Sequence, residues 1–335
     1  MLPNRRDFLL AAAATASAGV IWSAQRPRAQ AQEAPPETTT IRLAKSPSLC
    51  VMPQYVVDEL LAAEGLTRIE YVVTDSGPLL SEAIAAGQID FALHFSGPLI
   101  LELDRGKKIT MLAGVHVGCF ELFAKDDIRG IADLKGRSVG ISALESSPHV
   151  FVSAMAALVG LDPAKDINWV TSAEPKPIEL FLDGKVDAFL GFPPEPQRLR
   201  AQGVNHVIVN SAQDRPWSQY FCCMLAGNPD FVRTKPIAAR RVVRAILRAT
   251  DLCVSAPAEV ARRTVDRGFT QNYDYALQTL SDVPYGKWRD YDPEDTIRFY
   301  ALRLHEAGMI QSSPDRIIAE GADWRLLRDV RRDLG

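Results

Sequence analysis

The stretch TDSGPLLSEAIAAGQIDFALHFSGPLI (residues 74–100) contains the tripeptide Ser-Gly-Pro twice, at 76–78 and at 96–98. Each copy follows a run rich in β-branched or aromatic residues, RIEYVVTD (68–75) and IDFALHF (89–95), and precedes a segment with helical spacing. Proline suits the first turn of a helix, and serine or glycine suits the cap before it. The stretch therefore predicts two successive strand-to-helix units, from which parallel sheets are built.

The alternation of strands and helices extends on both sides of this stretch and then restarts. The first series adds strands at 41–45 and 108–115 and helices at 53–65, 81–87 and 98–106. The second series has strands at 138–142, 167–172, 186–192 and 206–210 and helices at 147–160 and 177–184. The apolar run YFCCMLAGNPDFV (220–232) suits a strand that crosses back, and the chain from residue 236 onward is predicted to be helical. The sequence thus predicts an α/β fold in which one series of alternating strands and helices ends and a second series follows.

The chain length also favours two globular units, because 335 residues are about twice the length of a typical domain. The N-terminus stands apart from both. It carries Arg5-Arg6, an apolar Ala-rich stretch and the small-x-small sequence Ala29-Gln30-Ala31. We interpret residues 1–31 as a twin-arginine export signal and 32–40 as a linker. The alternative, a membrane anchor, would need a longer and more apolar span than this one, which ends before Arg26.

Charge and cysteine content exclude several classes of protein. Loss of residues 1–31 removes four arginines and one aspartate and takes the formal charge from −3 to −6, so the mature chain lacks the basic surface of a nucleic-acid-binding protein. The five cysteines have neither CxxC nor zinc-finger spacing, so we expect core residues rather than a disulfide framework: Cys50, Cys119, Cys222, Cys223 and Cys253. The sequence also lacks G-x-S-x-G, Walker and HExxH motifs.

The predicted helix starts point to a ligand site. In open α/β sheets, ligands bind beyond the carboxyl ends of the strands, where free N–H groups at helix starts favour acceptors. Both Ser-Gly-Pro sequences lie at such ends, and Ser146-Ser147-Pro148 occupies the same position in the second series. The hypothesis is that these starts form two walls of one cleft. The alternative is that they are ordinary helix caps.

Three segments carry a resemblance to a known family. LSEAIAAGQIDFAL (80–93) is echoed by IELFLDGKVDAFLG (178–191), and residues 131–170 begin with IADLKGRSVGIS and end with GLDPAKDINWV. Together they resemble the periplasmic substrate-binding proteins of ABC transporters, in the nitrate/sulfonate/taurine and thiamine-precursor group. The resemblance implies the two-lobe type II periplasmic-binding-protein fold, each lobe a mainly parallel sheet flanked by helices.

The resemblance also implies boundaries and partners. Lobe 1 would comprise 41–124 and 226–335 and lobe 2 would comprise 125–225, with hinges near 123–127 and 224–228. The protein would capture a small polar ligand in the periplasm and deliver it to an ABC permease. We expect a monomer, no cofactor, no catalytic residue and no metal.

Position after predicted strand ends selects the candidate ligand-binding residues. They are Ser46, Ser48, Ser76, Gly77, His94, Phe95, Ser96, Gly97, His116, Ser142, Glu145, Ser146, Ser147, Phe192, Glu195 and Trp217. Serines and backbone amides would bind acceptors, and the aromatic residues would supply apolar walls. The histidines His94, His116 and His149 match no metal-ligand spacing.

The two glutamates bear on the ligand's charge. A pocket for bare nitrate or sulfonate would avoid carboxylates, so if Glu145 and Glu195 face the ligand, an amine, amide or N-heterocycle is favoured. Two other functions stay open. One is a ligand-sensing subunit of a signalling receptor. The other is an enzyme similar to the fungal thiamine pyrimidine synthase, which shares the fold and uses a lysine-bound pyridoxal phosphate and a cysteine cluster; Lys45 and Cys222-Cys223 are only superficially similar to these.

Overall fold

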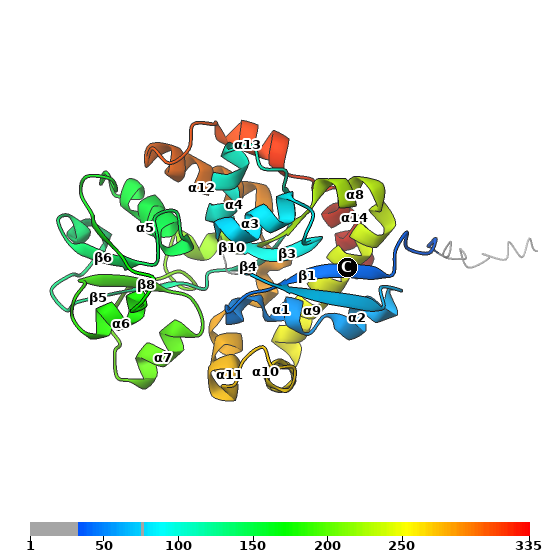
Figure 1. The fold of residues 1–335 in the computed structure, drawn as a ribbon, viewed down its shortest axis with the longest axis horizontal. Coiled ribbons are helices and arrows are strands. Elements are labelled where there is room, and N and C mark those ends of the chain that lie inside the picture. The colour runs from blue at the N-terminus through cyan, green and yellow to red at the C-terminus, as the bar shows by residue number, and fades with distance from the viewer. Residues whose placement is uncertain (1–32, 75–76) are drawn as a thin grey trace, which may run out of the picture. The chain divides into compact units, whose positions relative to one another are not determined.

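The computed structural model describes residues 33–74 and 77–335. The predicted export signal and the candidate Ser76 therefore lie outside the described residues. Residues 36–335 form one compact unit built on two five-stranded sheets, which Figure 1 shows with β5, β6 and β8 in one half and β1, β3 and β10 in the other. The α/β fold class predicted from the alternating pattern is confirmed.

The first sheet has the strand order β2-β1-β3-β10-β4. Its strands are β1 (Thr40–Lys45), β2 (Arg68–Val73), β3 (Phe91–Phe95), β4 (Thr110–Val117) and β10 (Phe221–Gly227). β1 pairs in parallel with β2 and β3, whereas β10 runs antiparallel to both of its neighbours, β3 and β4. Four strands thus run in one direction, and their carboxyl ends lie at one edge of the sheet.

The second sheet repeats this arrangement with the order β7-β6-β8-β5-β9. Its strands are β5 (Glu121–Ala124), β6 (Ser138–Ile141), β7 (Asn168–Thr171), β8 (Ala188–Gly191) and β9 (Val207–Asn210). β6 is parallel to β7 and β8, and β5 is antiparallel to β8 and β9. Each sheet therefore has its one antiparallel strand in the fourth position. We call each sheet with its helices a lobe.

Helices connect the parallel strands as the sequence predicts. Those before β10 are α1 (Met52–Tyr55), α2 (Asp58–Ala63), α3 (Pro78–Ala85), α4 (Ser96–Asp104), α5 (Ser147–Leu158), α6 (Pro177–Leu182) and α7 (Glu195–Ala201). The single helix predicted at 53–65 is divided into α1 and α2 around Val56 and Val57. A 3₁₀ turn, η1 (Leu49–Val51), precedes α1.

The C-terminal third is helical, as expected. Its helices are α8 (Pro229–Thr234), α9 (Pro236–Ser255), α10 (Pro257–Asp266), α11 (Tyr273–Asp282), α12 (Pro293–Glu306), α13 (Pro314–Gly321) and α14 (Arg325–Leu334). Most begin with proline, and Asn228, Asn272, Asp292 and Ser313 cap helices by accepting a backbone N–H. α12 packs against α4 of the first lobe and α5 of the second. No helix among residues 33–74 and 77–335 is long and apolar enough to cross a membrane.

The strand pairings displace the predicted lobe limits by a few residues. β5 belongs to the second sheet, although the limit at 124/125 placed it in the first lobe. All of β10 belongs to the first sheet, although the limit at 225/226 divided it. The reason is backbone pairing with strands that are distant in sequence. The two crossings consequently fall at 118–120 and 211–220.

The two crossings lie side by side. Ser211, which is fully buried, accepts backbone N–H bonds from Cys119 (3.0 Å) and Phe120 (2.9 Å) on its Oγ and donates from Oγ to the Phe120 carbonyl (2.7 Å). Gly118 has φ +52°, and a Cβ there would lie 2.4 Å from Ala212 Cα. Only glycine fits this backbone conformation and this close approach without strain.

Candidate functional site

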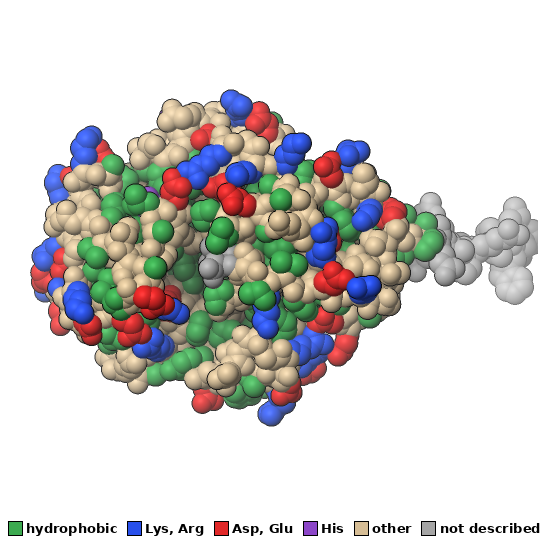
Figure 2. All heavy atoms as spheres, viewed as in Figure 1, with side chains coloured by type: hydrophobic (Ala, Val, Ile, Leu, Met, Phe, Trp, Pro, Cys, Tyr) green, Lys and Arg blue, Asp and Glu red, His purple; other side chains and the backbone are tan. Residues whose placement is uncertain are grey.

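A cavity of about 380 Å³ lies where strand ends and helix starts of the two lobes meet. Its lining residues are Pro47, Ser48, Phe95, Ser142, Ser147, Pro148, Lys176, Ile178, Phe192, Pro193, Pro194, Glu195, Arg198 and Tyr275. The volume falls within the range of small-molecule sites, about 300–1,000 Å³. Figure 2 shows charges of both signs scattered over this face of the molecule and hydrophobic side chains gathered in the depression between its two halves.

Two aromatic rings form the apolar wall of the cavity, one from each lobe. Phe95 ends β3, and Phe192 directly follows β8. Their ring centroids are 4.2 Å apart with an interplanar angle of 30°. Phe151 of α5 stands edge-on to Phe95 at 6.3 Å and supports the pair from behind. A flat apolar group can pack against such a pair.

Ser147 supplies a polar group without a partner. It is the first residue of α5 and is 3% exposed, and its Oγ has no hydrogen-bond partner among the described residues. Gly77, the cap of α3 in the first lobe, faces it: a Cβ on Gly77 would lie 3.9 Å from Ser147 Oγ. A buried hydroxyl without a partner is costly, so a ligand group that bonds to Ser147 would gain this interaction.

The charged residues of the cavity are Glu195, Lys176 and Arg198. Burial raises the pKa of Glu195 to about 7, although the Phe192 N–H and the two cations act in the opposite direction. Its Oε2 accepts the Phe192 N–H at 3.2 Å. Arg198 forms an ion pair with Glu179 (2.7 Å). The cavity therefore offers a carboxyl group that exchanges its proton near neutral pH, with a lysine nearby.

Six predicted site residues line this cavity together: Ser48, Phe95, Ser142, Ser147, Phe192 and Glu195. Ser46 lies beside them, with Ser48, His94 and Phe95, around a small closed space next to the cavity. Gly77 approaches Ser147 as described. The structure thus brings together residues from four predicted strand ends and one predicted helix start.

Two other predicted residues, His94 and Trp217, do not line the cavity and have structural partners instead. His94 is buried: its Nδ1 accepts the Phe95 N–H (2.8 Å), and its Nε2 lies 3.0 Å from Ser81 Oγ and 3.2 Å from the Gly77 carbonyl. Burial lowers the pKa of His94 to about 4, so it is neutral. Trp217 is buried against Phe299 and Tyr300.

Four more candidates lie at the contact between α4 and the start of α5. Glu145 forms an ion pair with Arg105 of the first lobe (2.5 Å) rather than lining the cavity. A Cβ at Gly97 would lie 2.8 Å from Val150 Cγ1, so close packing uses this glycine. Ser96 and Ser146 have Oγ atoms that are buried without a partner among the described residues.

Part of the cavity wall was not predicted from the sequence. Pro193, Pro194 and Arg198 follow β8, and Lys176 precedes α6. The rule that ligands lie beyond strand carboxyl ends applies to Pro193 and Pro194 as well as to Phe192, and could have found them. Lys176 carried no comparable signal, because it follows β7 only after a turn.

A second group of polar side chains lies in the core, outside the cavity. Cys50, His116 and Cys119 offer ligand atoms within 4.8 Å of one another, and all three residues are buried. His116 was expected at the cleft, but it does not line the cavity.

Comparisons with solved structures define the class of fold. The periplasmic nitrate-binding protein of Synechocystis superposes with a TM-score of 0.73 at 17% identity, covering 90% of each chain. The alkanesulfonate-binding protein of Xanthomonas axonopodis, bound to MOPS, gives 0.67 at 18% identity, covering 86% of this chain and 99% of the other. A ligand-binding component of an ABC-type import system from Staphylococcus aureus, with zinc bound, gives 0.71 at 12% identity over 88% and 99%. The fold is that of type II periplasmic binding proteins.

The sequence places the chain in a family within this class. Residues 34–266 match the NMT1-like family, and the chain belongs to that family. No curated protein sequence matches the chain.

Proposed function

We propose that the protein is an extracytoplasmic solute-binding protein that captures a small organic ligand between its lobes and delivers it to an ABC importer. The proposal rests on the 380 Å³ cavity, whose wall contains Phe95, Phe192 and the buried Ser147 hydroxyl, which has no hydrogen-bond partner in the part of the chain that the structure describes. Both lobes contribute to its wall, so a ligand there would favour the closed arrangement of the lobes. The fold shared with the nitrate- and alkanesulfonate-binding proteins supports the same function.

The polar groups of the cavity favour a ligand that has both hydrogen-bond donors and acceptors. Glu195 accepts hydrogen bonds when ionised, and Lys176 and Ser147 can donate. A simple anion such as nitrate would meet Lys176 but would also approach the Glu195 carboxyl, which is costly when it is ionised. A nitrogenous heterocycle with an N–H for Glu195, an oxygen acceptor for Lys176 and a flat face for the Phe95–Phe192 pair fits this set better. Taurine-like sulfonates, which carry an ammonium group, are the second choice.

Closure of the lobes would occur by hinge bending at the crossings 118–120 and 211–220. The bonds of Ser211 to Cys119 and Phe120 hold the two crossings together, so that they would bend as one. We further propose that the chain is exported through its twin-arginine signal, acts in the periplasm as a monomer and is recognised by the permease in its closed form.

The enzyme alternative has less support from the structure. Lys45, the lysine named for this alternative, does not line the cavity: its Nζ is 3.4 Å from the Gly268 carbonyl and 4.9 Å from the centre of the Phe269 ring. Lys45 lines a separate open hollow with Asp58, Tyr71, Arg267 and Phe269.

A thermal-shift screen tests the proposal. The purified protein, with a chelator present, is heated with pyrimidines, other N-heterocycles, amino acids, taurine, sulfonates and nitrate. A ligand at 100 times its dissociation constant stabilises the folded state by about 2.7 kcal/mol. We expect a nitrogenous compound to raise the melting temperature. If the protein, freed of bound ligand by unfolding and refolding, responds to no compound of these classes, the proposed ligand class is wrong.

Two serines of α5 make a matched pair that locates the site. Ser147→Ala removes the hydroxyl that faces the cavity, and we expect it to weaken ligand binding about tenfold, the value of one good hydrogen bond. Ser153→Ala removes another buried hydroxyl that has no partner among the residues described, but Ser153 does not line the cavity, so this variant should bind the ligand as the wild type does. Equal affinities in the two variants, measured by calorimetry, would contradict our placement of the site.

A further inference from the structure

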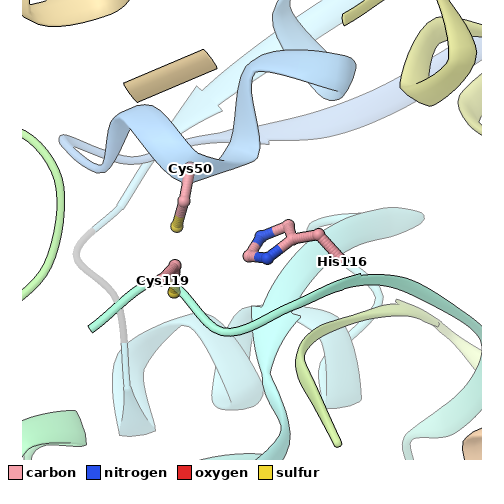
Figure 3. Close-up of side chains that lie close together, drawn as sticks. All are labelled: Cys50, His116 and Cys119. Atoms are coloured by element: carbon pink, nitrogen blue, oxygen red, sulfur yellow. The ribbon is translucent and has the colours of Figure 1, made fainter. Parts of the chain in front are cut away.

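The core cluster of sulfur and imidazole groups is built from segments that are far apart in sequence. Cys50 belongs to η1, His116 to β4, Cys119 to the crossing after β4, and Cys223 to β10. The ligand atoms of Cys50, His116 and Cys119 lie within 4.8 Å of one another, and Figure 3 shows the Cys50 sulfur and the His116 ring directed toward Cys119. Cys223 is paired with His116 across β10 and β4, and its Sγ is 3.9 Å from that of Cys50.

These distances suit a tetrahedral metal ion. With Zn–S bonds of about 2.3 Å and Zn–N bonds of about 2.0 Å, the ligand atoms of a tetrahedral site lie about 3.5–3.8 Å apart. The separation of Cys50 Sγ and Cys223 Sγ, 3.9 Å, is close to this value already. Small side-chain rotations would bring the ligand atoms of Cys50, His116 and Cys119, which lie within 4.8 Å of one another, to the same spacing.

The hydrogen bond of His116 leaves its other ring nitrogen available to bind a metal. Its Nδ1 lies 3.3 Å from the Gly118 carbonyl and can donate to it, while its Nε2 is fully buried without a hydrogen-bond partner among the described residues. In metal sites, the ring N–H that does not face the metal is bonded to a carbonyl or carboxylate in this way, which leaves the other nitrogen free to bind. A neutral core histidine would instead be expected to have partners on both nitrogens, as His94 has.

The chemistry of the group identifies the kind of ion. Three sulfur atoms and one imidazole nitrogen suit soft or borderline ions such as Zn²⁺ or Cu⁺, whereas Mg²⁺ and Ca²⁺ need oxygen ligands. An access route also exists: Cys119 is 6% exposed and lines a cavity of about 300 Å³ with Glu121, Arg200 and Asp282.

We propose that Cys50, His116, Cys119 and Cys223 form a binding site for one thiophilic metal ion. The site is distinct from the cavity of the proposed function and shares no lining residue with it. An ion there would join η1 and β10 of the first lobe to the 118–120 crossing, and would therefore stabilise the end of the hinge that adjoins the first lobe.

Co²⁺ is a suitable probe, because tetrahedral Co²⁺ bound to thiolates absorbs strongly in the visible and near ultraviolet. We expect the reduced, metal-free protein to bind one Co²⁺ per chain with a sulfur-to-metal charge-transfer band, and Zn²⁺ to displace the Co²⁺. The absence of this band in the folded wild-type protein would overturn the proposal.

Variants assign the ligands. Cys119→Ala and His116→Gln should each weaken Co²⁺ binding at least tenfold. Cys119 belongs to a crossing rather than a strand, so Cys119→Ala decides the question even if His116→Gln does not fold. Cys253→Ala is the matched control: Cys253 is a fully buried thiol of α9 outside the group. Unchanged Co²⁺ affinity in Cys119→Ala would overturn the assignment.

The metal test and the solute test have separate outcomes. Ser147→Ala, which changes the cavity, should bind Co²⁺ as the wild type does. Cys119→Ala should keep its thermal response to the cavity ligand in the presence of a chelator. Either site can therefore fail its test without affecting the result for the other.

Discussion

Replacement of Glu195 by glutamine should change how stability depends on pH. Burial raises the pKa of Glu195 from 4.5 to about 7 in the folded protein. A raised pKa means that the folded state holds the proton more tightly than the unfolded state does. The contribution of Glu195 to stability is therefore full below pH 4.5 and is lost as the pH rises through 7.

The size of the effect follows from the shift. One pKa unit corresponds to about 1.4 kcal/mol, so ionisation of Glu195 destabilises the ligand-free fold by about 3 kcal/mol between pH 4.5 and pH 8. Glutamine is neutral and nearly the same shape. We expect Glu195→Gln to be more stable than the wild type by less than about 1 kcal/mol near pH 5 and by about 3 kcal/mol at pH 8.

Urea unfolding of the ligand-free protein, followed by circular dichroism between pH 5 and pH 8.5, measures this difference. Glu145→Gln is the control, because hydrogen bonding to Arg105 lowers the pKa of Glu145, and the sign is therefore opposite. The Glu145 pair is exposed, so its loss should cost less than about 1 kcal/mol, and only above the pKa of the unfolded state. Parallel curves for the wild type and Glu195→Gln would contradict a raised pKa of Glu195 in the folded protein.

Two further predictions concern the crossings and the pair beside them. Gly118→Ala should destabilise the protein by about 3 kcal/mol in urea unfolding, because the new Cβ meets the backbone of the other crossing. Gly160→Ala is the control: it carries the same positive-φ strain, but its Cβ would lie in open space, so it should cost only about 1 kcal/mol. Equal losses would show that the crossings separate freely. Arg200→Ala should lower the free energy of unfolding by about 3 kcal/mol at pH 7, because it removes the partner of the buried Glu121 carboxylate, which lies 2.6 Å from Arg200. Arg233→Ala, which breaks an exposed ion pair, should cost almost nothing. A similar loss of stability in both variants would contradict this prediction.

Local signals in the sequence predicted the helices and strands whose ends lie at the cavity. Helices α3, α4 and α5 begin at Pro78, Ser96 and Ser147, where the Ser-Gly-Pro and Ser-Ser-Pro sequences predicted helix starts. These signals succeed because capping and proline effects act within one turn of backbone. The Ser147 and Phe192 positions followed from the strand ends alone.

Features that depend on distant partners could not be read in the same way. β5 is only four residues long, and its pairing with β8 and β9 joins segments more than 60 residues apart in sequence. Trp217 is buried because α12 brings Phe299 and Tyr300 to it. Cys223 joins Cys50, His116 and Cys119 only because β10 lies between β3 and β4, although the His116-x-x-Cys119 spacing was a signal that could have been weighed.

The position of β10 also sets an order in which the chain can complete its sheets. The second sheet uses one continuous stretch, from Glu121 to Asn210. Among the strands of residues 33–74 and 77–335, β10 is the only one hydrogen-bonded to β4, so β4 has no neighbouring strand until residues 221–227 have been made. During synthesis, the inserted lobe can therefore close its sheet on its own, while the lobe that begins the chain must wait for it with one strand unpaired.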